Sequence, residues 1–165
     1  MQSVTMRTSN QKKIVALGLA LFALMGLYVV SSQSGEDESN KATWSLVKVV
    51  DGDTIDVKDS TEVVQRVRLV GLDTAEPGEC GFREASEALA QLIGTNKINL
   101  SLAGTEDKDR YGRLLRYVDV EGRDLGLELI KDGYGIAAYD SRTKYPKHSR
   151  EDSYISADES SSNFC

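Results

Sequence analysis

Cysteine and histidine are scarce in this sequence, which excludes several classes of protein. The chain has two cysteines, Cys80 and Cys165, and a single histidine, His148. Zinc fingers and iron–sulfur proteins need more thiolate and imidazole ligands than these, and disulfide-rich scaffolds need several bridges. Any metal site in the chain must therefore be built mainly from oxygen atoms.

Positive charge is also in deficit. The chain carries 20 Lys+Arg against 26 Asp+Glu, a formal net charge of −6. The charge of the whole molecule therefore does not draw it to nucleic acid or to an anionic membrane. Any contact with a polyanion must come from a local cluster of basic side chains.

Length and composition are those of one globular domain. The chain has 165 residues, of which 40% are hydrophobic and 28% charged. Domains commonly have roughly 100 to 200 residues, so two full domains do not fit. This composition excludes a wholly disordered or collagen-like chain, and no internal repeats are visible.

The first 40 residues resemble an export signal, and the folded domain is expected over residues 41–165. Basic residues precede an uninterrupted apolar run over residues 14–30, and a polar, acidic stretch over residues 31–40 follows it. A signal-peptide core has roughly 7 to 15 apolar residues and a membrane span roughly 17 to 25, so a cleaved signal and a retained anchor both remain open. The length of the run slightly favours the anchor. The basic flank stays in the cytoplasm, which predicts a secreted or membrane-anchored domain outside it.

Five short segments of the domain have strand-like patterns: residues 44–50, 55–57, 63–72, 98–102 and 115–120. The first two flank Asp51-Gly52 and are expected to form a hairpin. In the last segment the alternation slips by one residue between Tyr117 and Val118. A charged loop over residues 105–112 separates the last two segments.

Three helices are expected around these strands. Apolar residues recur at helical spacing over residues 82–93, and Gly94 closes that segment. Asp124 and Gly133 suit the two ends of a short helix, and Ser149 with Asp152 has capping-box spacing ahead of a last one. The sequence therefore predicts an α+β, mainly β, fold: a five-stranded OB-type barrel with about three helices.

Charge is concentrated in three stretches where predicted strands end: Asp51-Gly52-Asp53-Thr54, the segment from Arg68 to Glu76, and Asp109-Arg110-Tyr111-Gly112-Arg113. Each stretch alone is weak evidence for a functional site, since Asp-Gly, for example, is an ordinary hairpin turn. Together, in order and at similar intervals, they resemble the staphylococcal nuclease family, phosphodiesterases built on an OB barrel, over residues 43–139. The resemblance implies Ca²⁺-dependent attack of water on DNA and RNA, releasing a 5′-hydroxyl and leaving a 3′-phosphate.

The resemblance also implies a metal site. Asp53, Asp73 and the main-chain carbonyl of Thr74 would coordinate Ca²⁺, with Asp51 near the ion. Hard oxygen ligands without histidine or thiolate suit Ca²⁺ rather than Zn²⁺.

Three further residues match the family's catalytic positions. Glu76 is the candidate general base that orients or deprotonates the attacking water. Arg68 and Arg113 would grip the phosphate, since a guanidinium makes two parallel bonds to phosphate oxygens and stays charged. The chain departs from the family where Ala75 replaces a usual proline and Pro77 follows the acid, and in being acidic, whereas the best-known member is basic.

The same resemblance predicts how substrate is held. Arg110 and Tyr111 match positions that contact a terminal phosphate, and Tyr139 matches a tyrosine that lies along the base. Because a tyrosine face stacks on any base, single-stranded or denatured DNA and RNA are expected to bind with little sequence preference. Tyr134 and Tyr145 are either additional substrate contacts or residues of the barrel rim.

Two features outside the motifs have open interpretations. In an exported domain Cys80 and Cys165 are expected to pair, which would tie the C-terminus to the loop after Glu76. The basic residues of 144–150 either approach the nucleic-acid backbone or form a solvated loop. A monomer is expected.

Two other functions remain possible from sequence: a non-catalytic OB module that binds nucleic acid or another ligand, and a domain in which Ca²⁺ is purely structural. A diverged binding module would be expected to have lost carboxylates or arginines. The two arginines (Arg68 and Arg113) and the four carboxylates (Asp51, Asp53, Asp73 and Glu76) are all present here, which favours the enzyme.

Overall fold

The computed structural model describes residues 43–165. The signal or anchor predicted over residues 14–30, and the boundary predicted between residues 40 and 41, lie outside the described residues. No helix among residues 43–165 is both long and apolar enough to cross a membrane.

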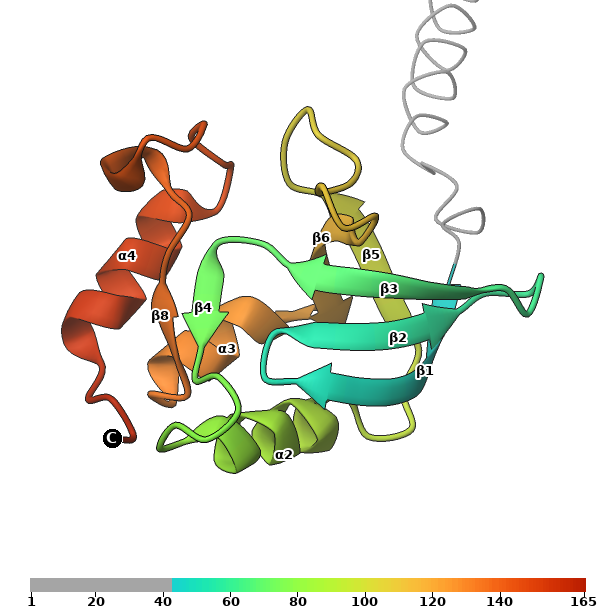
Figure 1. Cartoon of the computed structure of the whole chain (residues 1–165), viewed down its shortest axis with the longest axis horizontal. Coiled ribbons are helices and arrows are strands. Elements are labelled where there is room, and N and C mark those ends of the chain that lie inside the picture. The colour runs from blue at the N-terminus through green and yellow to red at the C-terminus, as the bar shows by residue number, and fades with distance from the viewer. Residues whose placement is uncertain (1–42) are drawn as a thin grey trace, which may run out of the picture. The chain divides into compact units, whose positions relative to one another are not determined.

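Five strands close a barrel (Figure 1): β1 (Thr43–Asp51), β2 (Thr54–Lys58), β3 (Val64–Leu69), β5 (Ile98–Leu102) and β6 (Leu114–Val120). The strand order is β3-β2-β1-β5-β6, and a parallel pairing of β3 with β6 closes the ring. The short β7 (Arg123–Asp124) pairs with β6. The predicted α+β fold with a five-stranded barrel is confirmed.

The predicted hairpin is formed by β1 and β2, and its turn is packed tightly against neighbouring elements. A Cβ at Gly52 would lie 2.7 Å from both the Ala85 Cβ and the Thr74 Oγ1. Glycine is therefore needed for close approach of the backbone at this turn. This packing fixes the positions of Asp51 and Asp53, which lie on either side of Gly52.

The single strand predicted over residues 63–72 is wrong, because the chain turns inside it. β3 ends at Leu69, and β4 (Leu72–Thr74) pairs with β8 (Gly135–Ala137), a strand that the sequence did not predict. Gly71 has φ +84°, a conformation that other residues rarely adopt. Gly71 thus permits the turn that separates the two strands.

The slip predicted between Tyr117 and Val118 is also wrong. The pairing of β5 with β6 runs without interruption from Asn99–Asp119 to Leu102–Arg116. Both Tyr117 and Val118 are buried although neighbouring strand residues point to opposite faces. The Tyr117 ring packs on aromatic rings of the C-terminal segment, so both faces of β6 are covered.

The described residues 43–165 form three α-helices: α2 (Phe82–Ile93), α3 (Leu125–Lys131) and α4 (Glu151–Ser160). The first has the predicted bounds, and the Gly94 N–H closes it on the Ala90 carbonyl at 2.9 Å. Asp124 caps α3 by accepting from the Gly126 N–H, and Gly133, with φ +78°, follows its end as predicted. In Figure 1, α2 lies beside β1, and α3 and α4 pack together.

The capping box predicted for the last helix does not form. Arg150 is the residue that precedes α4, and no side chain caps the helix there. The Ser149 hydroxyl instead donates to the Tyr117 hydroxyl at 3.3 Å, and Asp152 pairs with Lys147. The N-terminus of α4 is therefore held by tertiary contacts rather than by a local cap.

Two basic residues of the run over residues 144–150, His148 and Arg150, are used inside the fold. The Arg150 guanidinium is paired with Asp119 at 2.6 Å and with Asp124 at 2.9 Å. His148 is buried, and its Nδ1 lies 2.8 Å from the Tyr117 hydroxyl. These two side chains attach α4 to the barrel, whereas Lys144 and Lys147 are exposed, so an approach of nucleic acid to these two lysines stays a prediction.

Candidate active site

Two turns of the barrel meet where the predicted site residues lie. Thr54 at the start of β2 pairs with Arg68 near the end of β3, and the Leu69 N–H donates to the Asp53 carbonyl at 2.8 Å. The turn after β3 then brings the carboxylate of Asp73, in β4, to 3.1 Å from the Arg68 guanidinium. Residues separated in sequence are thereby brought into one cluster.

Arg68 is the centre of this cluster. Its side chain is buried, with Nη2 2.9 Å from an Asp53 carboxylate oxygen and 3.1 Å from one of Asp73. Nη1 donates to the main-chain carbonyls of Leu69 at 2.7 Å and Leu72 at 3.1 Å. Four acceptors from β3, β4 and the hairpin therefore hold the guanidinium in one orientation.

Asp53 is buried and only partly compensated in charge. The Thr54 hydroxyl donates to it at 2.9 Å and the Thr74 hydroxyl at 3.3 Å, while its own N–H donates to the Asp51 carboxylate at 3.2 Å. Burial raises the pKa of Asp53 to about 6, Arg68 opposes the rise, and the negative charge of Asp51 adds to it. The Arg68 guanidinium pairs with both Asp53 and Asp73, and Asp51 adds a third carboxylate, so negative charge is in surplus at this point.

The oxygen atoms of this cluster fit a hard divalent cation. Asp51, Asp53, Asp73 and Thr74 offer oxygen donors without sulfur or nitrogen, and the raised Asp53 pKa marks a carboxylate whose charged form a cation would favour. Within the described part of the chain, however, no three acidic, histidine or cysteine side chains are grouped closely enough to hold a metal. The chemistry of the donors fits Ca²⁺. The ligand set named from sequence, which includes the Thr74 main-chain carbonyl, stays a prediction.

Two tyrosines form an aromatic edge beside the cluster. The Tyr139 hydroxyl donates to Asp73 at 3.3 Å, and the Arg68 guanidinium lies 5.4 Å from the centre of its ring. Burial and the Asp73 charge raise the pKa of Tyr139, so the phenol keeps its proton and can donate. The Tyr145 ring packs edge-on against Tyr139 at 5.4 Å, and both are exposed, which leaves aromatic surface for a base.

A second basic group lies at the start of β6. The Asp109 carboxylate accepts from the Arg113 Nε at 2.6 Å and from the main-chain N–H groups of Tyr111 and Arg113 at 2.9 Å. Arg110 and Arg113 lie 4.9 and 5.5 Å from the centre of the Tyr111 ring. Asp109 thus shapes a loop with two guanidinium groups around an exposed tyrosine.

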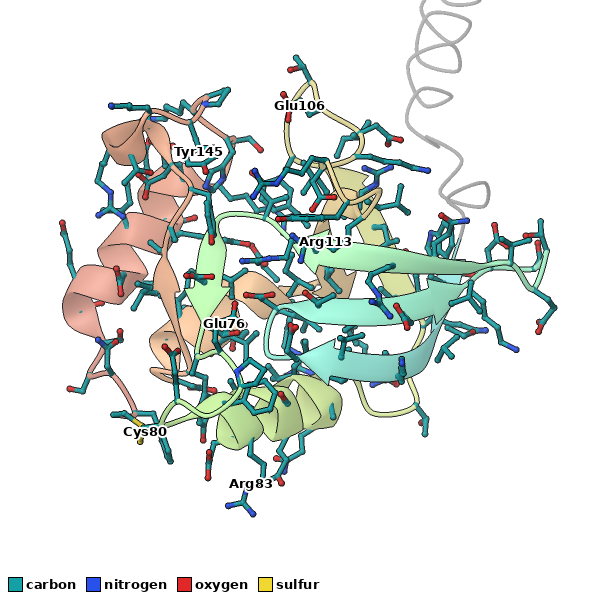
Figure 2. The ribbon with its side chains drawn as sticks, viewed as in Figure 1. Glu76, Cys80, Arg83, Glu106, Arg113 and Tyr145 are labelled. Atoms are coloured by element: carbon teal, nitrogen blue, oxygen red, sulfur yellow. A yellow bond between two sulfur atoms is a disulfide. The ribbon has the colours of Figure 1, made fainter. Side chains whose placement is uncertain are left out.

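The parallel pairing of β3 with β6 brings this group near Arg68. Arg68 is in register with Leu115, two residues after Arg113. Figure 2 shows Arg113 near the end of β3 and Glu76 near the end of β4. The other two predicted catalytic residues, Arg113 and Glu76, are thus on loops that flank the Arg68 cluster.

Glu76 lies on an exposed turn. Its main-chain N–H donates to the Glu79 carboxylate at 2.8 Å. The loop that follows ends in the disulfide between Cys80 and Cys165. The contacts of Glu76 are thus within its own turn rather than with the Arg68 cluster.

Contacts join six of the ten predicted metal-ligand, catalytic and substrate residues into one network: Asp51, Asp53, Arg68, Asp73, Thr74 and Tyr139. The other four lie on the two flanking loops: Glu76, Arg110, Tyr111 and Arg113. Sequence reasoning assigned no role to Thr54 or Asp109, although both stand inside the recognised motifs. The carbonyl acceptors of Arg68 had no signal in the sequence.

Comparison with known proteins identifies the family. The family model described as "Staphylococcal nuclease homologue" matches residues 66–161, which is more than half of the 165-residue chain. The chain belongs to the staphylococcal nuclease family. The family predicted from the three sequence motifs is confirmed, and the match includes the Arg68, Asp73, Glu76 and Arg113 positions.

Relatives within this family are named as nucleases. The chain is 34% identical to the SPbeta prophage-derived endonuclease YokF of Bacillus subtilis over 116 residues, 66% of this chain and 39% of that protein. It is 33% identical to the thermonuclease of Staphylococcus hyicus over 112 residues, 64% of this chain and 65% of that protein. Endonuclease YncB of Bacillus subtilis is 32% identical over 108 residues, 61% of this chain and 51% of that protein. The chain thus spans less than two thirds of each relative.

Proposed function

We propose that this protein is a Ca²⁺-dependent endonuclease that hydrolyses phosphodiester bonds of DNA and RNA with little sequence preference. The observation that carries the proposal is the buried Arg68, held between Asp53 and Asp73 beside the Tyr139 ring. A fixed guanidinium among carboxylates suits a site that takes a phosphate and a cation together. The names of its relatives support the same class of reaction.

Asp53, Asp73 and the main-chain carbonyl of Thr74 would hold Ca²⁺, with Asp51 beside them. The ion would offset negative charge on the phosphate. The surplus negative charge around Asp53 supports this assignment, since a buried carboxylate with a raised pKa gains from a bound cation.

The chain's own residues supply the remaining chemistry. Arg68 and Arg113 bind the equatorial oxygens of the phosphate, whose charge grows as water attacks phosphorus. Glu76 accepts a hydrogen bond from that water and takes its proton. The bond between phosphorus and the 5′-oxygen breaks, and the leaving oxygen takes a proton from solvent water. One fragment then carries a 5′-hydroxyl and the other a 3′-phosphate.

Substrate binding is proposed to combine stacking with local charge. Tyr139 would stack on a base, and Arg110 with Tyr111 would contact a further phosphate. Stacking needs unpaired bases, so single-stranded or denatured nucleic acid is the expected substrate. The basic groups are local, which reconciles a polyanionic substrate with a chain of net charge −6.

We also propose that the protein works outside the cytoplasm as a monomer. The basic and apolar start of the sequence supports export, and the Cys80–Cys165 disulfide suits an oxidising compartment. The protein would be anchored through residues 14–30 or secreted after their cleavage.

Cleavage of denatured DNA by the full chain tests the proposal. Ca²⁺ should support cleavage and EDTA should abolish it. Arg113→Ala should lower kcat about 100-fold or more through lost transition-state stabilisation, and Glu76→Gln should slow the chemical step by a similar factor. The control is Arg83→Ala, on the exposed surface of α2, which should stay within about twofold of wild type.

Each result has a distinct meaning. Cleavage that needs Ca²⁺ and is lost in both variants supports the nuclease. A folded protein that binds Ca²⁺ and single-stranded DNA without cleaving it would instead be a binding module. RNA offered in the same assay, with analysis of the new ends, tests the predicted substrate range and the 3′-phosphate.

A further inference from the structure

The turn that carries Glu76 is fixed by its own residues. The Glu79 N–H donates to the Glu76 carbonyl at 2.9 Å, and the Glu76 N–H donates to the Glu79 carboxylate at 2.8 Å. Pro77 and Gly78 occupy the two central positions, and Gly78 has φ +95°. Proline followed by a glycine with positive φ is the pattern of a type II turn. Glu76 therefore sits on a small rigid unit.

Hydrogen bonds do not attach this unit to the opposite side of the site. Beyond the turn, the Phe82 N–H donates to the Glu79 carbonyl at 3.4 Å and the Ala85 N–H to the Gly81 carbonyl at 2.8 Å. In the described part of the chain, the main-chain bonds of residues 76–81 thus all stay within residues 76–85. Ala75, which precedes the turn, does not restrict its own backbone as proline would.

The disulfide supplies the missing attachment. Cys80, one residue after the turn, is bonded to Cys165 at the end of the chain, with the two Cα atoms 6.1 Å apart. Its sequence separation is 85 residues, so the bond joins the Glu76 loop to a distant segment.

The segment that holds Cys165 is itself firmly seated. The Phe164 N–H donates to the Gly133 carbonyl at 2.9 Å, and the Phe164 ring packs on Tyr134 at 5.4 Å. A Cβ at Gly133 would lie only 2.2 Å from the Ser162 carbonyl oxygen, so glycine allows the close approach of the two backbones. The tail is therefore anchored immediately before β8.

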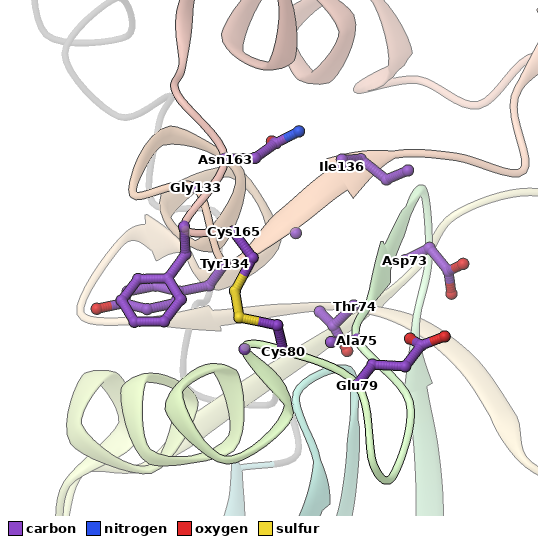
Figure 3. A pocket seen from close by; sticks show the side chains of 13 residues that line it. Asp73, Thr74, Ala75, Glu79, Cys80, Gly133, Tyr134, Ile136, Asn163 and Cys165 are labelled. Atoms are coloured by element: carbon purple, nitrogen blue, oxygen red, sulfur yellow. A yellow bond between two sulfur atoms is a disulfide. The ribbon is translucent and has the colours of Figure 1, made fainter.

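The Glu76 loop, the disulfide, the C-terminal tail, β8 and β4 form a closed frame, in which each part is connected to the next. β8 pairs with β4, where Ile136 is in register with Asp73. An open surface pocket of about 310 Å³ lies beside this frame, with Asp73, Thr74 and Ala75 on one side and the disulfide on another (Figure 3). On the side that lines this pocket, the loop residues Ala75 and Cys80 therefore face open space rather than packed side chains.

We propose that the Cys80–Cys165 disulfide positions Glu76, so that the protein is fully active only in its oxidised form. The inference rests on the proposed nuclease function and adds a redox requirement to it. Cys80 and Cys165 are positioning residues, because they act through Glu76 rather than on the substrate. A general base displaced by about 1 Å loses on the order of 10-fold to 100-fold in rate.

The chemistry of the switch is simple thiol–disulfide exchange. Dithiothreitol transfers two electrons and two protons to the Cys80–Cys165 bond, which becomes two thiols, and is itself oxidised to its cyclic disulfide. The full chain is compared before and after this treatment, at a temperature where circular dichroism shows both forms to be folded. We expect kcat to fall at least 10-fold on reduction, with KM for denatured DNA changed by less than about twofold.

Two variants separate positioning from a general loss of structure. Cys80→Ser/Cys165→Ser should have the activity of the reduced wild type and should not respond to dithiothreitol. In Glu76→Gln the residual rate should not fall further on reduction, because the group that the disulfide positions is already removed. An equal fall in that background, or an unchanged kcat in reduced wild type, would overturn the proposal.

Hydrogen exchange gives a readout that does not depend on activity. Reduction should speed exchange of residues 75–81 at least 10-fold while the barrel strands remain protected; unchanged exchange in that loop would also refute the proposal. If oxidised wild type does not cleave DNA at all, the nuclease function fails, and the exchange result still decides whether the disulfide holds the loop.

If the reduced domain unfolds, Pro77→Gly provides the test with the disulfide intact. It removes the backbone restriction of the turn, so kcat should fall about 10-fold with little change in KM. An unchanged kcat in this variant would mean that the position of the Glu76 turn does not limit the reaction.

Discussion

At the scale of single residues, Asp53 is a buried carboxylate of the candidate site whose negative charge is only partly compensated. Burial raises its pKa from 3.8 to about 6, although Arg68 lies 2.9 Å away. The guanidinium is shared with Asp73, and Asp51 adds further negative charge. An aspartate that served only to stabilise the fold would be better placed near the surface, where its charge costs little.

The raised pKa predicts the direction of a pH effect on stability. Between about pH 4 and pH 6 the folded state binds a proton at Asp53 that the unfolded state has released, so this residue's contribution to stability falls as pH rises through that range. Asp53→Asn resembles the neutral acid and removes the effect. The quantity to compare is the unfolding free energy of Asp53→Asn minus that of wild type, both measured in EDTA. This difference should increase by on the order of 2 kcal/mol from pH 4 to pH 6.

Urea unfolding at several pH values measures this difference. Asp59→Asn is the control, because hydrogen bonds from the Thr61 side chain and N–H lower the pKa of Asp59. Its contribution is lost as pH falls, so the variant's difference from wild type should have the opposite slope. A flat difference for Asp53→Asn would mean that its carboxylate is fully compensated.

At the scale of elements, sequence patterns predicted the long, regular segments best. The spacing of apolar residues and the closing Gly94 predicted α2 with its observed bounds, because an amphipathic helix carries its signal along its whole length. The strands β4 and β8 have three residues each, too few for an alternating pattern. Their pairing depends on contacts between distant parts of the chain, which local patterns do not contain.

The candidate site was predicted in its residue types but not in its arrangement. The motifs identified Arg68 and Asp73, yet the carbonyls that orient Arg68 depend on the turn at Gly71. The basic appearance of residues 144–150 was misleading for a similar reason. The acidic partners of Arg150, Asp119 and Asp124, come from distant strands, so no local signal showed that its charge is used inside the fold.

Arg150 should accordingly be a main attachment of α4 to the barrel. Its guanidinium makes bonds of 2.6 and 2.8 Å to the two oxygens of Asp119 and lies 4.2 Å from the centre of the Tyr117 ring. Arg150→Ala would remove the positive charge that pairs with the half-buried carboxylates of Asp119 and Asp124. We expect the unfolding free energy to fall by about 2–3 kcal/mol.

Lys147→Ala is the matched control, because Lys147 lies in the same segment that leads into α4. The Lys147–Asp152 pair is solvent-exposed on both sides, so its loss should change stability by less than about 0.5 kcal/mol. Urea unfolding of both variants at pH 7 gives the comparison. Equal effects would show that the Arg150 pair adds no more than an ordinary surface pair.

At the scale of the whole molecule, the site joins parts of the chain that fold together. Asp53 comes from the β1–β2 hairpin, whereas Asp73 comes from β4, which pairs with β8 beyond the barrel. A cation held by both carboxylates would link the closed barrel to the two-stranded sheet of β4 and β8, against which the C-terminal segment lies. Its binding energy would then add to the stability of the folded domain rather than to one loop.

Ca²⁺ should therefore raise the unfolding temperature of the full chain without any substrate. A ligand that binds only the folded state stabilises it by about 2.7 kcal/mol at 100 times its dissociation constant. The gain should be smaller at pH 5 than at pH 7.5, because Asp53, with a pKa of about 6, must lose a proton before it can coordinate the ion. Asp73→Asn should remain folded but lose most of the Ca²⁺ effect, whereas Asp132→Asn, on the surface after α3, should keep it. A Ca²⁺ effect retained in Asp73→Asn would place the ion elsewhere in the protein, and the assignment of this cluster as the metal site would be wrong.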